Sequence, residues 1–419
     1  MATCLGHAAD RKQPPTPEPS PSMQFDMKPF GFQRISRRIL MSGRSSITVN
    51  FAGTDRVLIT FGIRKLMKRD PNETENDHDR ELHVVLLELP AGKLIAETDW
   101  RVHDEGQYLW PLSEGRFLLR ERNRLRILDP AHAPAAEALQ SHPVFDAGNG
   151  QELTFVDVTA DGTMVELQTH RGKMIGDDLD LEGDPDANRI HKTLIRFYAV
   201  DPVKPELRLK GRSEIQGQFH APFNAQGFLS VSDEDATHWG FDFHTFSGET
   251  KELAGLETSC SPQASFLSES RFLVAGCRGG EARNMMGVLD LDGHVLWLGP
   301  RDQLLWAGLY PAPGSGRFAV RRTLTNTPSS AMLVDGIQET SGQRMTVLRS
   351  ATGEELMHVT VIPAMQSRQN FALSEDGRQL AVWNDDTVEI YALPQLTEKD
   401  KETVVAGKSG GVVLVPAKP

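Results

Sequence analysis

Residues 371–382 have the sequence FALSEDGRQLAV, and this stretch decides the fold. An apolar run, FAL, leads into the polar turn SEDG, and after Arg378 and Gln379 a second apolar run begins. Short apolar runs on either side of a glycine-containing polar turn are typical of a β-hairpin. The stretch therefore predicts two antiparallel strands joined by a tight turn.

The same template recurs along the chain. A pair of apolar residues is followed by a Ser/Asp/Glu/Gly turn, often by an arginine, and then by an apolar run. Clear copies occupy residues 109–119, 266–274 and 310–320, and looser copies occupy 51–59, 156–165 and 223–231. A repeated hairpin is the sequence signature of a repeat architecture.

The spacing of the copies identifies that architecture. Each hairpin is followed by a third apolar stretch, and several continue through a glycine turn into a fourth. The shortest distances between copies are about 45 residues, which is the length of a four-stranded propeller blade. No helical periodicity lies between the copies. The sequence therefore predicts an all-β fold, a seven-bladed β-propeller of four-stranded antiparallel blades.

The ends of the chain have a different composition. Residues 1–28 begin with a Pro/Ser-rich segment and are expected to form a disordered tail, the propeller to span 29–396, and 397–419 to form a C-terminal tail. The last blade lacks a clear fourth strand. We expect an N-terminal strand within Phe30 to Met41 to complete it and remove an open sheet edge. The alternative is a strand through Val412–Val415.

Composition excludes some partners. The formal net charge is −12, so nucleic acid is not expected as a partner. The one basic run, residues 34–38, is interpreted as a solvated strand edge. No apolar stretch is long enough to span a membrane.

The start of the chain leaves the compartment open. No secretory leader is visible, which indicates a cytoplasmic protein as the sequence is written. Cys4 and the Pro/Ser-rich segment after it resemble the start of a mature bacterial lipoprotein. The protein would be extracytoplasmic if the start of the sequence is mis-assigned or trimmed.

Three insertions interrupt the regular spacing, at about residues 67–81, 172–191 and 322–343. Each falls between the second and third strands of a blade, so all three are expected on one face of the disc. Loops clustered on one face of a rigid scaffold often bind partners. Propellers also tolerate insertions that have no function, because a longer loop costs little extra free energy to close.

The second insertion is densely acidic. Asp178, Asp180, Glu182 and Asp184 follow the spacing at the start of a calcium loop, where hard oxygen ligands surround a cation. Arg189 stands where such a loop places its bidentate glutamate. The alternatives are a Ca²⁺ site and a solvated acidic loop, and no other cofactor is expected.

Two further groups could form sites. Cys260 and Cys277 lie at the ends of neighbouring predicted strands, so they are either a disulfide or two buried thiols. The segment 238–244, HWGFDFH, alternates polar and aromatic residues and places His238, Asp242 and His244 on one strand face. That face is either a metal site or the solvated face of a half-buried strand.

Residues 30–395 resemble the broad propeller superfamily that includes WD-repeat, YVTN-type and quinoprotein-like proteins. Trp383-Asn384-Asp385 is similar to the Trp-Asp signature, and the segment DGHVLW at 292–297 is similar to a quinoprotein blade. Each phrase occurs in one blade only. The resemblance is to a divergent bacterial propeller of uncharacterised type, and it implies the fold rather than a ligand.

The sequence leaves two main hypotheses for function, and a calcium-stabilised extracytoplasmic propeller as a third, because it contains none of the common catalytic motifs. The leading hypothesis is a non-enzymatic binding or scaffold propeller that presents its loop-decorated face to a protein or peptide. The alternative is a glycan- or peptide-acting hydrolase or lyase in the central channel. The alternative requires carboxylates or histidines from different blades to converge on the axis. The sequence does not indicate an oligomeric state.

Overall fold

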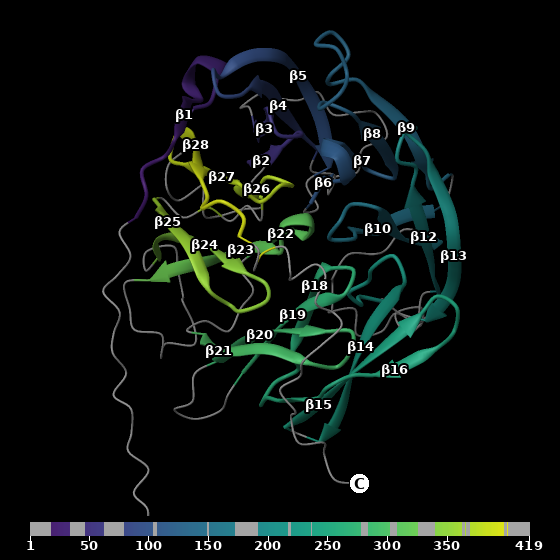
Figure 1. The fold of residues 1–419 in the computed structure, drawn as a ribbon. Helices are drawn as coiled ribbons and strands as arrows, with labels where there is room; N and C mark the ends of the chain where they lie inside the picture. Colours follow the sequence, from purple (N-terminus) through teal and green to yellow (C-terminus); the bar gives the residue numbers. More distant parts are fainter. Residues whose placement is uncertain are drawn as a thin grey trace, which may run out of the picture.

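The computed structural model describes residues 18–33, 47–62, 79–103, 107–148, 151–171, 192–216, 219–235, 237–277, 284–301, 308–325, 340–362, 365, 369–397 and 400. Seven four-stranded antiparallel sheets form a closed ring around a central axis (Figure 1). The prediction of an all-β, seven-bladed propeller is confirmed. In six of the blades the first strand lies nearest the axis and the fourth lies at the rim (Figure 1).

The blades follow the chain in order. Blade one contains β2 (Thr48–Phe51), β3 (Arg56–Gly62), β4 (Asp79–Glu88) and β5 (Lys93–His103); blade two contains β6 (Leu109–Pro111), β7 (Phe117–Glu121), β8 (Arg124–Leu128) and β9 (Ser141–Asp146); blade three contains β10 (Gln151–Val158), β11 (Met164–Arg171), β12 (Lys192–Val200) and β13 (Leu207–Gln216). Blade four contains β14 (Gly227–Asp235), β15 (His238–Thr245), β16 (Thr250–Glu252) and β17 (Leu256–Glu257); blade five contains β18 (Gln263–Ser268), β19 (Arg271–Gly276), β20 (Asn284–Asp290) and β21 (Val295–Arg301). Blade six contains β22 (Leu309–Ala312), β23 (Arg317–Thr325), β24 (Thr340–Arg349) and β25 (Glu355–Val361); blade seven contains β26 (Phe371–Leu373), β27 (Gln379–Asn384), β28 (Thr387–Ala392) and β1 (Met23–Asp26). Short 3₁₀ helices cover Lys28–Phe30 (η1), Ser113–Gly115 (η2) and Pro313–Ser315 (η3).

The ring is closed by an N-terminal strand, as predicted, but not by the predicted segment. β1 pairs with β28 in the register Met23↔Ile390, so the closing strand precedes Phe30 to Met41 and lies inside the segment 1–28 that we assigned to the tail. The sequence MQFD alternates apolar and polar residues, and Met23 and Phe25 pack against the apolar cluster between blades one and seven. The alternative strand, Val412–Val415, lies outside the described residues.

The apolar core consists of clusters between adjacent blades. The cluster between blades seven and one joins Trp383 of β27, which is completely buried, to Phe61 of β3 and to Phe32. The rings of Phe32 and Trp383 meet edge to face with their centroids 5.0 Å apart. Because every blade buries both sheet faces in this way, the ring is a rigid support for the turns at its two ends.

The recurrent arginine of the repeat holds neighbouring blades together. It begins the second strand and donates to the segment that follows the third strand of the next blade. Arg116, which is 3% exposed, illustrates the pattern with a bond from Nη1 to the Asp201 carbonyl oxygen of 2.7 Å. The same contact recurs from Arg56 to Pro130 O, from Arg271 to Ser350 Oγ and from Arg317 to Pro394 O.

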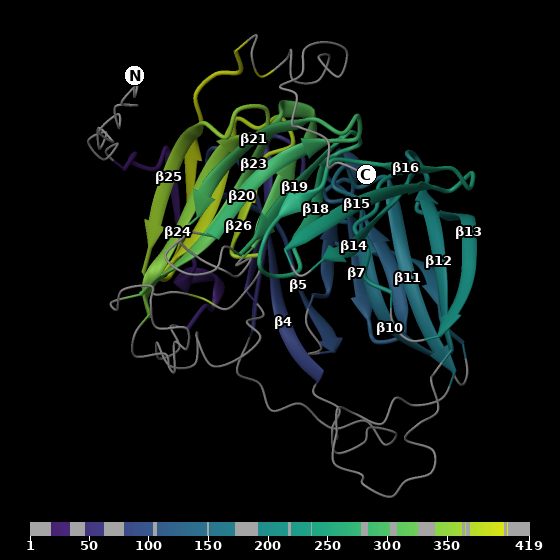
Figure 2. The ribbon, with the colours of Figure 1, turned by 90° about the horizontal axis from the view of Figure 1, so that it is seen from below.

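The two ends of the ring differ. The three insertions follow β3, β11 and β23, so the strands that flank them reach the same end of the ring, which we call the insertion end (Figure 2). The turns between first and second strands form the opposite end, which we call the turn end. Among the described residues, no helix is long and apolar enough to cross a membrane.

Candidate functional site

The turns at the turn end pack directly against one another around the axis. In blade three, Asp161 accepts hydrogen bonds from the Thr159 hydroxyl (2.7 Å) and the Thr163 amide (3.1 Å), which fixes the turn. Gly162 follows with φ of +70°, and a Cβ there would lie 2.3 Å from the amide nitrogen of Ser113 in blade two. Only glycine fits this position. The close packing brings the acidic side chains of separate turns near one another.

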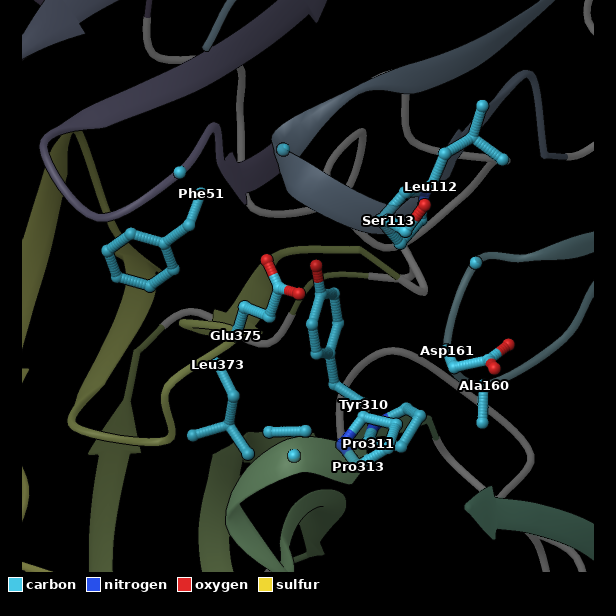
Figure 3. A pocket seen from close by; sticks show the side chains of 16 residues that line it. Phe51, Leu112, Ser113, Ala160, Asp161, Tyr310, Pro311, Pro313, Leu373 and Glu375 are labelled. Atoms are coloured by element: carbon cyan, nitrogen blue, oxygen red, sulfur yellow. The ribbon is translucent and has the colours of Figure 1, made fainter. Parts of the chain in front are cut away.

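A cavity of about 120 Å³ opens at the turn end of the axis, and we call it the axial pocket. Asp161 and Glu375 lie on opposite sides of it, and the Tyr310 ring stands between them (Figure 3). Apolar side chains and turn backbone form the rest of the wall. The lining residues are Phe51, Gly53, Pro111, Leu112, Ser113, Gly115, Ala160, Asp161, Gly162, Tyr310, Pro311, Ala312, Pro313, Gly314, Leu373 and Glu375.

Tyr310 joins the pocket to the interior of blade one. Its hydroxyl donates to Oδ1 of the buried Asn50 at 3.4 Å, and its ring packs against Phe371. Burial, and then the negative charge of Glu375, raises the pKa of Tyr310 above its usual value. The phenol therefore stays protonated at neutral pH and offers the pocket a neutral aromatic ring.

Another acid, Glu269 of blade five, interacts with Asp161. Glu269, in the β18–β19 turn, is half-buried, and its carboxylate accepts from the Ala225 amide at 3.2 Å. Burial of Glu269, followed by the charge of Asp161, raises the pKa of the Glu269 carboxyl to about 7. Asp161 and Glu269 therefore form a pair of acids in which Glu269 holds a proton for a large part of the time at neutral pH.

Blade three contains another acidic pair. Glu166 of β11 lies opposite Asp157 of β10 in the strand register. Its side chain is completely buried, Oε1 accepts from Gln168 at 2.7 Å, and Oε2 has no hydrogen-bond partner among the described residues. Burial raises the pKa of Glu166 to about 8 and that of Asp157 to about 6. Glu166 is thus a neutral acid at pH 7.

The predicted calcium ligands are not tested by the structure. Asp178, Asp180, Glu182 and Asp184 lie outside the described residues. The one set of three metal-ligating side chains within the described ranges is Asp290, Asp292 and His294, in the turn after β20. Asp290 already accepts from the amides of the other two residues, at 3.0 and 2.8 Å, so its carboxylate is used to form the turn.

The histidines of blade four are not gathered around one point. His238 bonds Asp235 at 2.9 Å, whereas His244 bonds the Ser230 hydroxyl through Nε2 at 2.8 Å and stacks on Phe228. Each ring is held by its own local partners. Asp242, between them in sequence, is half-buried. The arrangement matches the solvated face of a half-buried strand rather than a metal site.

Cys260 and Cys277 form a disulfide in the structure. Their Cα atoms are 5.4 Å apart. The bond joins the segment before β18 to the end of β19, where the Thr258 hydroxyl also donates to the Cys277 carbonyl oxygen at 2.6 Å. It lies in blade five and contributes no side chain to the axial pocket.

Sequence reasoning did not single out the residues of the axial pocket. Asp161 and Glu375 are the acidic residues of the repeated turns, where an acid is expected merely for chain reversal. The repeat pattern does show one property that Asp161 and Glu375 share, which is that each occupies a turn between the first and second strands of its blade. Their meeting at the axis depends on the closure of seven blades, which no local pattern contains.

Comparison with known proteins gives the fold alone. No family model and no curated protein matches the chain. The chain is similar to the β-propeller domain of the Trilobed protease from Pyrococcus furiosus, with 11% identity over 84% of this chain and 98% of that one and a TM-score of 0.44. It is also similar to an oligogalacturonate lyase in complex with manganese (13% identity, 76% and 86% covered, TM-score 0.44) and to a chain of a mitotic checkpoint complex (11%, 69% and 90%, 0.36). Likenesses this distant carry no argument about function.

Proposed function

We propose that this chain is a binding propeller for a protein or peptide, and that its axial pocket receives one positively charged side chain of that partner. The observation that carries the proposal is the placement of Asp161 and Glu375 on opposite walls of a small pocket with apolar sides. Two carboxylates can pair with one guanidinium or ammonium group, and Arg is the better match because its planar fork bonds carboxylates in two directions.

The size of the pocket favours a side chain over a whole ligand. Cavities that bury small molecules usually span roughly 300–1,000 Å³, whereas this one holds about 120 Å³. The stem of a lysine or arginine can lie along apolar walls while its charged end meets the acids. Phe51 and Tyr310 supply those walls, and an aromatic face also attracts a cation. The remainder of the partner would lie across the turn end.

A pair of matched peptides tests the proposal. The probes are a capped Gly-Gly-Arg-Gly-Gly peptide and its citrulline counterpart, which has the same shape without the charge, and saturation-transfer NMR on the full chain detects binding. We expect the arginine peptide alone to bind, and Asp161→Asn or Glu375→Gln to weaken it at least tenfold. Glu249→Gln, which changes an exposed acid of blade four, is the control. Equal binding of both peptides, or no effect of either pocket variant, contradicts the proposal.

A catalytic role is the second candidate, because Glu269 beside Asp161 is a carboxyl with a pKa of about 7. A carboxyl of that pKa next to a second carboxyl group is suited to general acid catalysis of glycan or peptide cleavage. Incubation of the protein with polysaccharide and peptide mixtures, followed by product analysis, tests this role. Turnover that Glu269→Gln abolishes would replace the binding proposal by the catalytic one.

A further inference from the structure

Among the described residues, blade four has no complete inner strand. In each of the other six sheets a separate strand lies on the axis side of the second strand, namely β2, β6, β10, β18, β22 and β26. In blade four the axis side of β14 is paired through a single bridge, Phe223↔Phe228, within the described residues. The second strand of this blade is therefore partly a sheet edge that faces the channel.

The reason lies in the segment that enters the blade. Gln168 of β11 is hydrogen-bonded to both the carbonyl and the amide of Phe219, and His220 packs edge to face on Phe155 of β10. These contacts hold the entering chain against blade three instead of along β14. The chain reaches β14 at Pro222, whose carbonyl oxygen accepts from the Leu229 amide at 2.8 Å. Asn224 then donates to Gly227, and the turn follows.

Beyond Leu229, no described residue forms a backbone hydrogen bond with the axis side of β14. The strand nevertheless continues to Asp235 and stays paired with β15 on its other side. Successive residues of a strand direct their amide and carbonyl groups to opposite edges. Since Leu229 bonds inward, Val231 and Asp233 also offer their backbone groups to the channel. Of these two residues, Asp233 is exposed and Val231 is half-buried, so the edge is open to solvent at Asp233.

We propose that the open edge of β14, from Val231 to Asp235, binds an extended basic segment of a protein partner, which supplies the inner strand missing from the described part of blade four. Addition of a strand to an open sheet edge is a common mode of peptide recognition, in which backbone bonds give affinity and alternate side chains give specificity. The occupant is basic because Asp233 and Asp235 carry exposed carboxylates on the same strand. Opposite charges on neighbouring strands stabilise pairing, and like charges oppose it. The segment would carry Lys or Arg at alternate positions.

This inference concerns a different site from the axial pocket. The Asp235 carboxylate already accepts from the Thr237 amide at 2.8 Å and pairs with His238, so Asp233 is the carboxylate that we expect to select the partner. Strand addition uses the backbone of Val231 and Asp233, whereas the pocket uses side chains of blades three and seven. The two proposals can therefore fail independently.

The test uses hydrogen–deuterium exchange of the full chain with the capped peptide Lys-Thr-Lys-Val-Lys and a matched Glu-Thr-Glu-Val-Glu peptide. We expect the basic peptide to slow exchange of the 231–235 amides at least tenfold. Asp233→Lys should weaken the basic peptide at least tenfold and allow the acidic one to bind. Val231→Pro removes a backbone amide that points toward the channel and leaves the bonds to β15 in place. It should therefore abolish the slowing of exchange at residues 231–235. Glu249→Lys is the control for a charge change elsewhere in the blade.

Several results would overturn the inference. One is the absence of protection at 231–235, and another is protection that survives both the charge reversal and the proline. Peptide binding that disappears with Asp161→Asn and Glu375→Gln, but not with Asp233→Lys, would place the basic peptide in the axial pocket instead. Protection at β14 that persists in the pocket variants would support strand addition even if the pocket proposal fails.

Discussion

Replacement of Glu166 by glutamine should stabilise the protein, and the gain should grow with pH. Glu166 is completely buried, and glutamine keeps its shape and the acceptor that Gln168 bonds. The folded protein holds the Glu166 proton up to a pKa of about 8, whereas the unfolded chain releases it near the ordinary value of 4.5. Between these values the unfolded state binds fewer protons, so folding becomes less favourable as pH rises. Glutamine has no proton to lose and avoids that cost.

The size of the effect follows from the two pKa values. Each pH unit between them costs about 1.4 kcal/mol. At pH 5 the expected gain for Glu166→Gln is below about 1 kcal/mol, and at pH 7 it is about 3 kcal/mol. Above pH 8 the folded protein also ionises, so the gain levels off at roughly 5 kcal/mol.

The assay is thermal and urea unfolding of both proteins at pH 5, 7 and 8.5. Glu137→Gln, which changes an exposed acid in the loop after β8, is the matched control and should have no pH-dependent effect. A Glu166→Gln variant whose advantage does not increase from pH 5 to pH 7, or which is less stable than the parent at pH 7, refutes the reasoning. Such a result would mean that Glu166 is ionised in the folded protein.

Two further predictions concern buried arginines. Asp400 accepts a hydrogen bond from the Arg349 Nε at 2.8 Å. Burial alone would raise the pKa of the Asp400 carboxyl. The hydrogen bonds to this carboxyl, that from Arg349 foremost, outweigh burial and hold its pKa well below the usual range. Its stabilising contribution is therefore present above about pH 4 and is lost as pH falls further. Asp400→Asn should cost about 3–5 kcal/mol in urea unfolding at pH 7, because the buried guanidinium groups of Arg317 and Arg349 lose the negative charge that they share. Arg116→Met should cost about 2–3 kcal/mol, whereas Arg124→Met, at an exposed side chain, should leave the melting temperature nearly unchanged.

The repeated turn explains why the fold could be predicted from the sequence. A hairpin such as residues 371–382 depends on local chemistry: strand-forming residues, a glycine with positive φ at Gly377, and alternation of buried side chains. Seven such units leave few ways to bury their faces other than against each other. The closing strand was misplaced because the segment after the Pro/Ser-rich tail contains only four strand residues, Met23–Asp26. A strand so short forms only because β28 offers an open edge.

The sites could not be predicted in the same way, because they depend on contacts between distant blades. Asp161 and Glu375 are more than 200 residues apart in sequence and meet through ring closure. The incomplete inner strand in the described part of blade four was equally unpredictable, because residues 223–231 resemble the other hairpins in sequence. The bonds between Gln168 and Phe219, which hold the entering chain against blade three, join residues of different blades. Both features depend on side-chain contacts between blades, which the repeat pattern does not specify.

The repeat gives its turn residues two roles, and this links the stability of the ring to its binding chemistry. An acid in the turn satisfies backbone amides, as Asp161 does for Thr163, and in a closed ring the same acids are also placed around one axis. Negative charges held close together around the axis repel one another and oppose folding. Glu269 reduces this repulsion when it holds a proton. A cation bound in the axial pocket would relieve the rest. A positively charged partner would therefore stabilise the turn end, which is the physical basis of the binding role that we propose for this propeller.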